Sequence, residues 1–201
     1  MRKFTGSELL VATHNKGKLE EIAALFSDRQ VSVKGAADFG LPEPAETEKT
    51  FVGNARIKAH AAAKATGLPA LSDDSGLMVD DLGGEPGVYT ADWAETPNGR
   101  DFAMAMRKVY DRLVETGRPQ PWRAGFVCTF VLAWPDGHDE VFEGKVNGEI
   151  VWPGLGENGH GYDPIFKPEG YDVTFGEMDR WEKNRISHRA RAFAKLQACF
   201  T

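Results

Sequence analysis

The feature that most constrains the fold of this chain is the alternation of short apolar runs with segments of helical periodicity. Residues 9–12 have the continuous hydrophobicity of a buried strand, and residues 19–26 repeat their apolar side chains at helical spacing. A second strand is expected at residues 31–33, and an alanine-rich helix at residues 50–66 should end at Gly67. Strands that alternate with helices predict an α/β fold.

The second half of the chain adds one long hairpin to this pattern. Residues 123–134 and 140–151 are rich in strand-forming side chains and are separated by a turn at residues 135–137. A further amphipathic helix is expected at residues 100–115. We therefore expect a central mixed, twisted sheet flanked by helices, in a single domain over residues 1–201. Hydrophobic residues make up 41% of the chain, which is enough for a core of that size.

The charge balance and hydropathy exclude several classes of partner. The chain has 24 Lys and Arg residues against 30 Asp and Glu residues, a net charge of -6. Because nucleic-acid-binding proteins usually present a basic face, we expect no nucleic-acid partner, whereas a small polyanion held by a few lysines stays compatible with this charge. No apolar stretch resembles a membrane span or a signal peptide, which predicts no membrane association and a cytoplasmic location.

A polar turn, Thr13-His14-Asn15-Lys16-Gly17-Lys18, follows the first predicted strand. It precedes a helix N-terminus, where unsatisfied backbone N–H groups and the helix dipole favour an anion. Its two lysines add mobile positive charges, and its glycine lets the backbone approach a ligand. The turn is typical of a phosphate site, although its spacing is not that of a Walker A motif. An ordinary surface turn with solvated lysines is the alternative.

Two adjacent carboxylates, Asp73 and Asp74, follow a strand expected at residues 70–72, and the apolar residues 77–79 are a candidate continuation of it. Apolar residues flank them on both sides, so the carboxylates need compensating positive charge. Neighbouring side chains of a strand point to opposite faces, so we expect one carboxylate to face a metal or water and the other to face backbone or a helix terminus. The alternative is a solvated turn, in which Asp, Ser and Gly are common.

Two segments near the C-terminus offer contacts for a flat, anionic ligand. A glycine-rich loop carries His160 and Tyr162, either of which could stack on a base. Ser187 is expected to cap the final helix, which puts His188 and Arg189 in its first turn. Cations are unfavourable at a helix N-terminus, so an anionic ligand there would explain them. A plain flexible loop and a basic, solvent-facing helix are the alternatives.

These segments together resemble the inosine/xanthosine triphosphate pyrophosphatase family. The resemblance covers nearly the whole chain, and its motifs occur in the same order. The matching segments are residues 10–18, 46–55, 71–77, 82–89, 161–166 and 182–189. His14 and His160 depart from the pattern, since the family often has Gly and Phe there. The first departure bears on how the turn wraps phosphate, and the second on how the base is stacked.

The resemblance implies a hydrolase that cleaves ITP, dITP and XTP to the monophosphate and pyrophosphate, and so cleanses the nucleotide pool. It also implies a homodimer and a nucleotide cleft between two lobes. Lys16, Lys18 and Lys183 should hold phosphates, and His188 and Arg189 should read the base. The full set of substrate-binding residues that it implies is Thr13, His14, Asn15, Lys16, Gly17, Lys18, Ser75, His160, Gly161, Tyr162, Asp163, Lys183, His188 and Arg189.

The resemblance further implies a Mg²⁺ cofactor held by Glu46 and Asp74. Mg²⁺ binds few carboxylates and completes its shell with phosphates and waters. Asp74 is also the candidate general base for a water that attacks the α-phosphorus, so that pyrophosphate leaves. One carboxylate cannot easily be both a tight metal ligand and a free base, so the two roles stay open as alternatives.

Two other functions fit the same residues. One is a pyrophosphatase for other modified nucleotides, and the other is a nucleotide sensor without turnover. The presence of both Glu46 and Asp74 favours an enzyme over the sensor, because a pure binder needs no pairing of a metal with a base.

Overall fold

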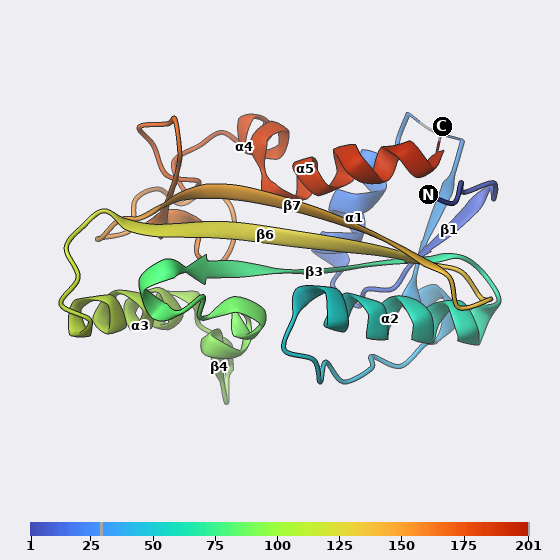
Figure 1. Ribbon diagram of the computed structural model, residues 1–201, viewed down its shortest axis with the longest axis horizontal. Helices are drawn as coiled ribbons and strands as arrows, with labels where there is room; N and C mark the ends of the chain where they lie inside the picture. Colours follow the sequence, from blue (N-terminus) through green and yellow to red (C-terminus); the bar gives the residue numbers. More distant parts are fainter. Residues whose placement is uncertain (29, 201) are drawn as a thin grey trace. The chain divides into compact units, whose positions relative to one another are not determined.

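The described part of the computed structural model, residues 1–28 and 30–200, contains a six-stranded mixed sheet and five α-helices (Figure 1). The strand order is β2-β1-β3-β6-β7-β8, and β4 and β5 pair separately. Strand β1 is parallel to β2 and β3, whereas β7 and β8 are antiparallel, which confirms the expected mixed α/β sheet. The strands are β1 Glu8–Val11, β2 Ser32–Gly35, β3 Ala70–Val79, β4 Glu95–Thr96, β5 Gly99–Arg100, β6 Trp122–Ala133, β7 Asp139–Ile150 and β8 Phe166–Pro168. The helices are α1 Lys16–Leu25, α2 Phe51–Thr66, α3 Phe102–Glu115, α4 Arg180–Ile186 and α5 His188–Leu196.

The chain divides into two compact units. The first contains the described residues of Met1–Asp74, Thr129–Glu143 and Ala192–Thr201, and the second contains Ser75–Cys128 and Gly144–Arg191. The expectations of one domain over residues 1–201 and of a nucleotide cleft stay predictions. No helix in residues 1–28 and 30–200 combines the length and hydropathy needed to cross a bilayer.

Helix α2 packs within the first unit through alanine side chains. Thr50 caps its N-terminus by accepting a hydrogen bond from the backbone N–H of Gly53, and Gly67 ends it with a left-handed φ of 71°. Alanine favours the helix and keeps its buried face narrow, so the helix lies close to the strands. The buried residues of this core are Leu10, Ala12, Ala55, Ala59, Ala62, Ala63, Ala70, Val131 and Ala133.

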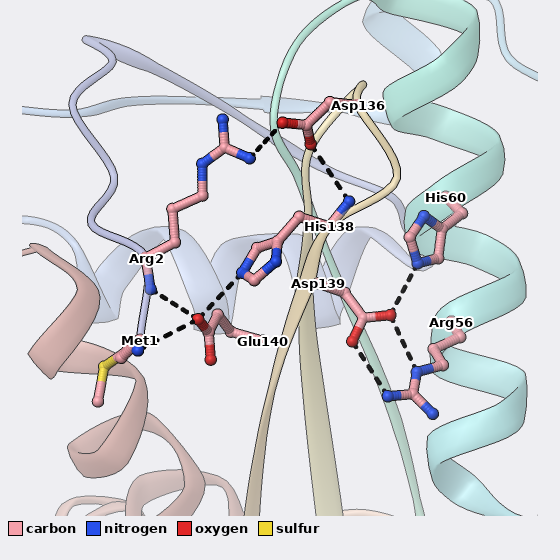
Figure 2. A network of polar contacts seen from close by, with 8 residues as sticks. All are labelled: Met1, Arg2, Arg56, His60, Asp136, His138, Asp139 and Glu140. Carbon is pink, nitrogen blue, oxygen red and sulfur yellow. Dashed lines mark hydrogen bonds and ion pairs between the residues drawn. The ribbon is translucent and has the colours of Figure 1, made fainter.

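A network of ion pairs holds α2 to the start of β7 (Figure 2). Arg56 donates two hydrogen bonds to Asp139, at 3.0 and 3.1 Å, and Nε2 of His60 lies 2.8 Å from the same carboxylate. The next residue, Glu140, accepts a hydrogen bond from the backbone N–H of Arg2 at 2.6 Å. These contacts tie the N-terminal segment, β7 and α2 together within the first unit.

The second unit has a core of its own around α3. Asp101 caps this helix by accepting a hydrogen bond from the backbone N–H of Met104 at 2.9 Å. Ala105, Val109 and Leu113 recur every four residues and are fully buried, as the amphipathic pattern predicted. Large aromatic side chains complete the core, among them Phe126, Tyr162, Phe166 and Phe175.

Two boundaries differ from the sequence expectation. Helix α1 begins at Lys16 rather than near residue 19, because Asn15 caps it by accepting a hydrogen bond from the backbone N–H of Lys18. Strand β3 runs from residue 70 to residue 79 without a break, because it lies between β1 and β6 in the sheet. The alternative of a solvated turn at Asp73 and Asp74 is therefore wrong, and both carboxylates are buried.

Candidate active site

The turn after β1 is shaped by its own side chains. The hydroxyl of Thr13 accepts a hydrogen bond from the backbone N–H of Asn15 at 3.2 Å, and the Asn15 side chain caps α1. Lys16, Gly17 and Lys18 form the first turn of this helix, and Lys16 is exposed. The positive end of α1 therefore carries two lysines, which suits an anion such as phosphate.

His14 joins this turn to the acidic loop, residues 41–49. Its Nε2 lies 2.8 Å from the carbonyl oxygen of Leu41, so this nitrogen carries the hydrogen. The acidic loop contains Glu46, whose side chain is 39% exposed. The residue that departs from the expected family pattern thus has a structural partner 27 positions further along the chain.

Lys18 provides the counter-ion for Asp73. The lysine Nζ lies 3.1 Å from Oδ2 of Asp73, whose side chain is only 2% exposed. A carboxylate buried to this degree needs a paired cation, which Lys18 supplies from α1. This ion pair links the N-terminus of α1 to β3.

Asp74, the neighbouring carboxylate, contacts a different residue. The Asn54 amide donates a hydrogen bond to Oδ2 of Asp74 at 3.3 Å. Burial raises the pKa of Asp74 to about 6, from an ordinary value of 3.8. Glu46 acts in the same direction, whereas Lys58 and Lys18 oppose it. A carboxyl group with this pKa is suited to accept a proton near neutral pH.

Lys58 is a site residue that the sequence analysis missed. Its ammonium forms an ion pair with Glu46, and its side chain is only 11% exposed. Burial disfavours the charged ammonium, yet the carboxylates of Asp73, Asp74 and Glu46 hold the pKa of Lys58 above its ordinary value. The signal in the sequence was helical spacing, because Lys58 lies four residues after Asn54 and so shares a face of α2 with it.

These charges form a cluster with an excess of one negative charge, from the three carboxylates of Glu46, Asp73 and Asp74 and the two ammonium groups of Lys18 and Lys58. Among residues 1–28 and 30–200, no three His, Cys, Asp or Glu side chains are arranged to hold a metal ion by themselves. A divalent cation such as Mg²⁺ needs only one or two carboxylates when phosphates and waters supply the rest.

Glu46 and Asp74 fit that requirement. They are hard oxygen donors, and they lie close enough that Glu46 raises the pKa of Asp74. A cation between them would relieve this repulsion. The first unit is therefore an α/β unit whose lysines suit an anionic ligand and whose carboxylates suit a metal ion bound to that ligand.

The glycine-rich loop of the second unit is organised around the buried carboxylate of Asp163. This carboxylate accepts a hydrogen bond from the backbone N–H of His160 at 2.5 Å and forms an ion pair with Lys183. Gly159 has a φ of 79°, and a Cβ there would lie 2.0 Å from Oδ2 of Asp163. Only glycine fits at this position, so the loop folds tightly over the carboxylate.

Tyr162 lies in the core rather than on the surface of this loop. Its hydroxyl donates to the carbonyl oxygen of Thr90 at 2.8 Å, and Phe102 packs edge-on against its ring with the ring centroids 5.7 Å apart. Burial raises the pKa of Tyr162 far above its usual range. The Tyr162 ring therefore has protein partners on its ring and hydroxyl, whereas His160 is exposed.

The capping role expected for Ser187 is confirmed. Its hydroxyl accepts a hydrogen bond from the backbone N–H of Ala190 at 3.2 Å, and α5 begins at the next residue. His188 is 9% exposed and stacks on Phe126, with ring centroids 5.1 Å apart and an interplanar angle of 17°. Arg189 and, on β3, Ser75 are half-buried.

Comparison with known proteins shows the family to which this α/β protein belongs. A sequence model of the Ham1 family matches residues 9–199, and the chain belongs to this family. A dITP/XTP pyrophosphatase of Ruegeria pomeroyi is 68% identical over 99% of this chain and 98% of its own length. A protein of the same name from Agrobacterium fabrum is 57% identical over 98% and 97%. The structure of a HAM1 protein from Coxiella burnetii covers 96% of this chain and 98% of its own, with a TM-score of 0.90 and 37% identity.

Proposed function

We propose that this chain hydrolyses the deaminated purine nucleoside triphosphates ITP, dITP and XTP to the monophosphate and pyrophosphate. The observation that carries the proposal is the charge cluster of the first unit, in which two buried carboxylates on β3 face lysines from α1 and α2. The names of the relatives at 68% and 57% identity support the substrate class.

The lysines have the role of binding the triphosphate. Lys16 and Lys18 lie in the first turn of α1, where backbone N–H groups and the helix dipole add to their charge. Lys58 extends the cluster from α2. Since phosphoryl transfer depends mainly on positioning and electrostatic stabilisation, these groups stabilise the charge that builds on the leaving pyrophosphate.

Mg²⁺ is the cofactor that we propose, with Glu46 and Asp74 as its protein ligands. When bound, it neutralises phosphate charge and orients the reacting groups. Other side chains of the site position these two carboxylates. Asn54 holds Asp74 in one orientation, and Lys58 holds Glu46 beside it.

Asp74 has two alternative roles in this scheme. As a general base, it accepts a proton from the water that attacks the α-phosphorus, and its pKa of about 6 suits that role. As a metal ligand, it stays ionised and leaves proton transfer to another group. The adjacent Asp73 fits neither role, because it is the counter-ion of Lys18.

The purine is recognised by residues of the second unit. Hypoxanthine and xanthine present a 6-oxo acceptor where adenine presents a donor, so donors from Arg189 and a backbone N–H select the oxo group, and His188 helps to read the base edge. Guanine shares the 6-oxo group, so rejection of GTP depends on its 2-amino group. His160 stacks on the base, and the backbone around Gly161 and Tyr162 lines it. Lys183, held by Asp163, contributes positive charge for the phosphates.

The protein works in the cytoplasm as a homodimer, without a nucleic-acid or membrane partner. The net charge of -6 supports a small substrate, since a nucleic-acid partner calls for a basic face.

Pyrophosphate release over a panel of triphosphates tests the proposal. The panel contains ITP, dITP, XTP, GTP, ATP and modified pyrimidine triphosphates, each assayed with Mg²⁺ and with EDTA. We expect Mg²⁺-dependent release from the first three far above the rest. Preference for another modified nucleotide would identify a pyrophosphatase with a different substrate class. Tight binding without turnover would identify a sensor instead.

A further inference from the structure

We propose that Asn54 is a positioning residue that connects Asp74 to the acidic loop carrying Glu46. The inference rests on the proposed function for the roles of these two carboxylates. Asn54 itself has no part in the chemistry, because it acts through Asp74 and through the backbone of Glu48. Its effect is to hold the two carboxylates in a fixed relation before the nucleotide binds.

The contacts of Asn54 fix the orientation of its side-chain amide. The residue is 2% exposed. Its Oδ1 accepts a hydrogen bond from the backbone N–H of Glu48 at 2.9 Å, and its Nδ2 donates to Oδ2 of Asp74 at 3.3 Å. Rotating the amide by half a turn would set a carbonyl oxygen against the Asp74 carboxylate and an NH₂ group against an N–H. Only one orientation satisfies both partners, so one amide links the β3 carboxylate to the loop.

Gly53 shows how closely the acidic loop lies on α2. A Cβ at this position would lie 2.6 Å from Cβ and 2.7 Å from Cγ of Glu48. The loop would have to move for any side chain here, even though alanine favours a helix. The loop therefore rests directly on the first turn of α2, where the Asn54 hydrogen bond forms.

Lys58 gives the loop a second attachment to the same helix. It lies one helical turn after Asn54 and forms the ion pair with Glu46. The loop is thus attached to α2 at Glu48 through a neutral hydrogen bond and at Glu46 through an ion pair. A divalent cation held by Glu46 would compete with the Lys58 ion pair, whereas the Asn54 hydrogen bond does not involve a carboxylate of the loop.

The Asn54 link should therefore matter for metal use and for turnover. A polar loop that is ordered in advance loses less conformational entropy when it binds a ligand. Without the link, Glu46 must be brought to Asp74 at the moment of binding. The expected signature is a higher Mg²⁺ concentration for half-maximal rate and a lower kcat, with a smaller change in the KM for nucleotide.

Two variants of Asn54 separate its two hydrogen bonds. Asn54→Ala removes both, so hydrogen–deuterium exchange of the amides at residues 46–49 in the metal-free protein should accelerate about tenfold, the value of one hydrogen bond. Its kcat should fall and its half-saturating Mg²⁺ should rise by at least about the same factor. Asn54→Asp keeps an acceptor for Glu48 but sets a carboxylate against Asp74. Loop exchange should stay near the parent value in that variant, while kcat falls.

Gly53→Ala tests the loop contact from the other side. It adds one methyl group, which meets Glu48 and also lies 2.9 Å from the capping hydroxyl of Thr50, and it leaves the Asn54 side chain in place. Exchange at residues 46–49 and half-saturating Mg²⁺ should both rise, with a smaller loss of kcat than in Asn54→Asp. The matched control is Ala63→Gly, which weakens the same helix at a buried position outside the charge cluster. The control should leave loop exchange and half-saturating Mg²⁺ at parent values.

Unchanged loop exchange and unchanged half-saturating Mg²⁺ in Asn54→Ala would overturn the inference, and so would equal changes in Ala63→Gly. If Asn54→Ala does not fold, the opposite patterns expected for Asn54→Asp and Gly53→Ala decide the question. If the parent protein releases no pyrophosphate from any nucleotide, the proposed function fails, while exchange in the metal-free protein still tests the link.

Discussion

Replacing Asp74 by Asn should abolish activity and at the same time stabilise the metal-free protein. The carboxyl group has a pKa of about 6 in the folded chain against an ordinary value of 3.8, mainly because it is buried. The folded state therefore binds this proton more tightly than the unfolded state does. Between these two pH values, rising pH destabilises the parent protein, whereas a neutral amide does not titrate.

The size of this effect follows from the two pKa values. The difference between about 6 and 3.8 corresponds to about 3 kcal/mol of unfolding free energy at neutral pH. In a chain of 201 residues this raises the melting temperature by about 6–12 °C. The advantage of Asp74→Asn should vanish below pH 3.8, where both side chains are neutral. Asn keeps a side-chain oxygen that accepts the hydrogen bond from Asn54, so this contact survives the loss of the charge.

Urea denaturation in EDTA, at several pH values from 3.5 to 8, measures the effect in parent and variant. Parallel assays with ITP and Mg²⁺ should show a loss of turnover of several orders of magnitude in the variant. Added Mg²⁺ should stabilise the parent more than the variant if Asp74 is a metal ligand. A variant that is less stable than the parent at neutral pH, or that hydrolyses ITP at the parent rate, would refute the reasoning.

Three further predictions concern other parts of the chain. Lys18→Ala should raise the KM about tenfold or more for every triphosphate alike, because phosphate contacts carry no base information; a loss confined to one base would put Lys18 in the base site. His160→Ala should weaken ITP binding by about 1–3 kcal/mol and His160→Phe should not, since stacking on a base survives in Phe; equal affinity of the Ala variant and the parent would remove His160 from the site. Burial opposes ionisation of Asp139, but hydrogen bonds from Arg56 and His60 hold its pKa below 3.8. Its ionised form therefore stabilises the fold above that pH, so Asp139→Asn should lower the melting temperature at pH 7, and the difference should shrink as the pH falls below 3.8 (Figure 2).

The parts of the fold that depend on local pattern could be predicted from the sequence. The alanine-rich stretch predicted α2 at nearly its observed length. The apolar spacing of Val109 and Leu113 predicted the buried face of α3. The sequence indicated strand at residues 70–72 and a continuation at residues 77–79, but it did not establish that β3 is unbroken between them, because Asp, Ser and Gly favour turns locally. Pairing with neighbouring strands overrides that preference, and no single segment of the sequence contains this information.

The candidate site could be predicted only as far as its motifs were contiguous. Lys18 and Asp74 stood out because each lies in a compact polar segment between apolar runs. The partners of those residues come from distant segments, as the pairing of Lys18 with Asp73 over 55 positions illustrates. Lys58 and Asn54 were missed as site residues because polar side chains in an alanine-rich helix usually face solvent. Their helical spacing of four was visible, but the carboxylates that they meet were not.

The central claim is that water attacks the α-phosphorus of a deaminated purine triphosphate and pyrophosphate leaves. Its most direct test is a single-turnover hydrolysis of dITP in water labelled with heavy oxygen, followed by mass spectrometry of both products. The account predicts one labelled oxygen in the monophosphate and none in the pyrophosphate, with Mg²⁺ required. Label in pyrophosphate, or release of orthophosphate in place of pyrophosphate, would contradict it.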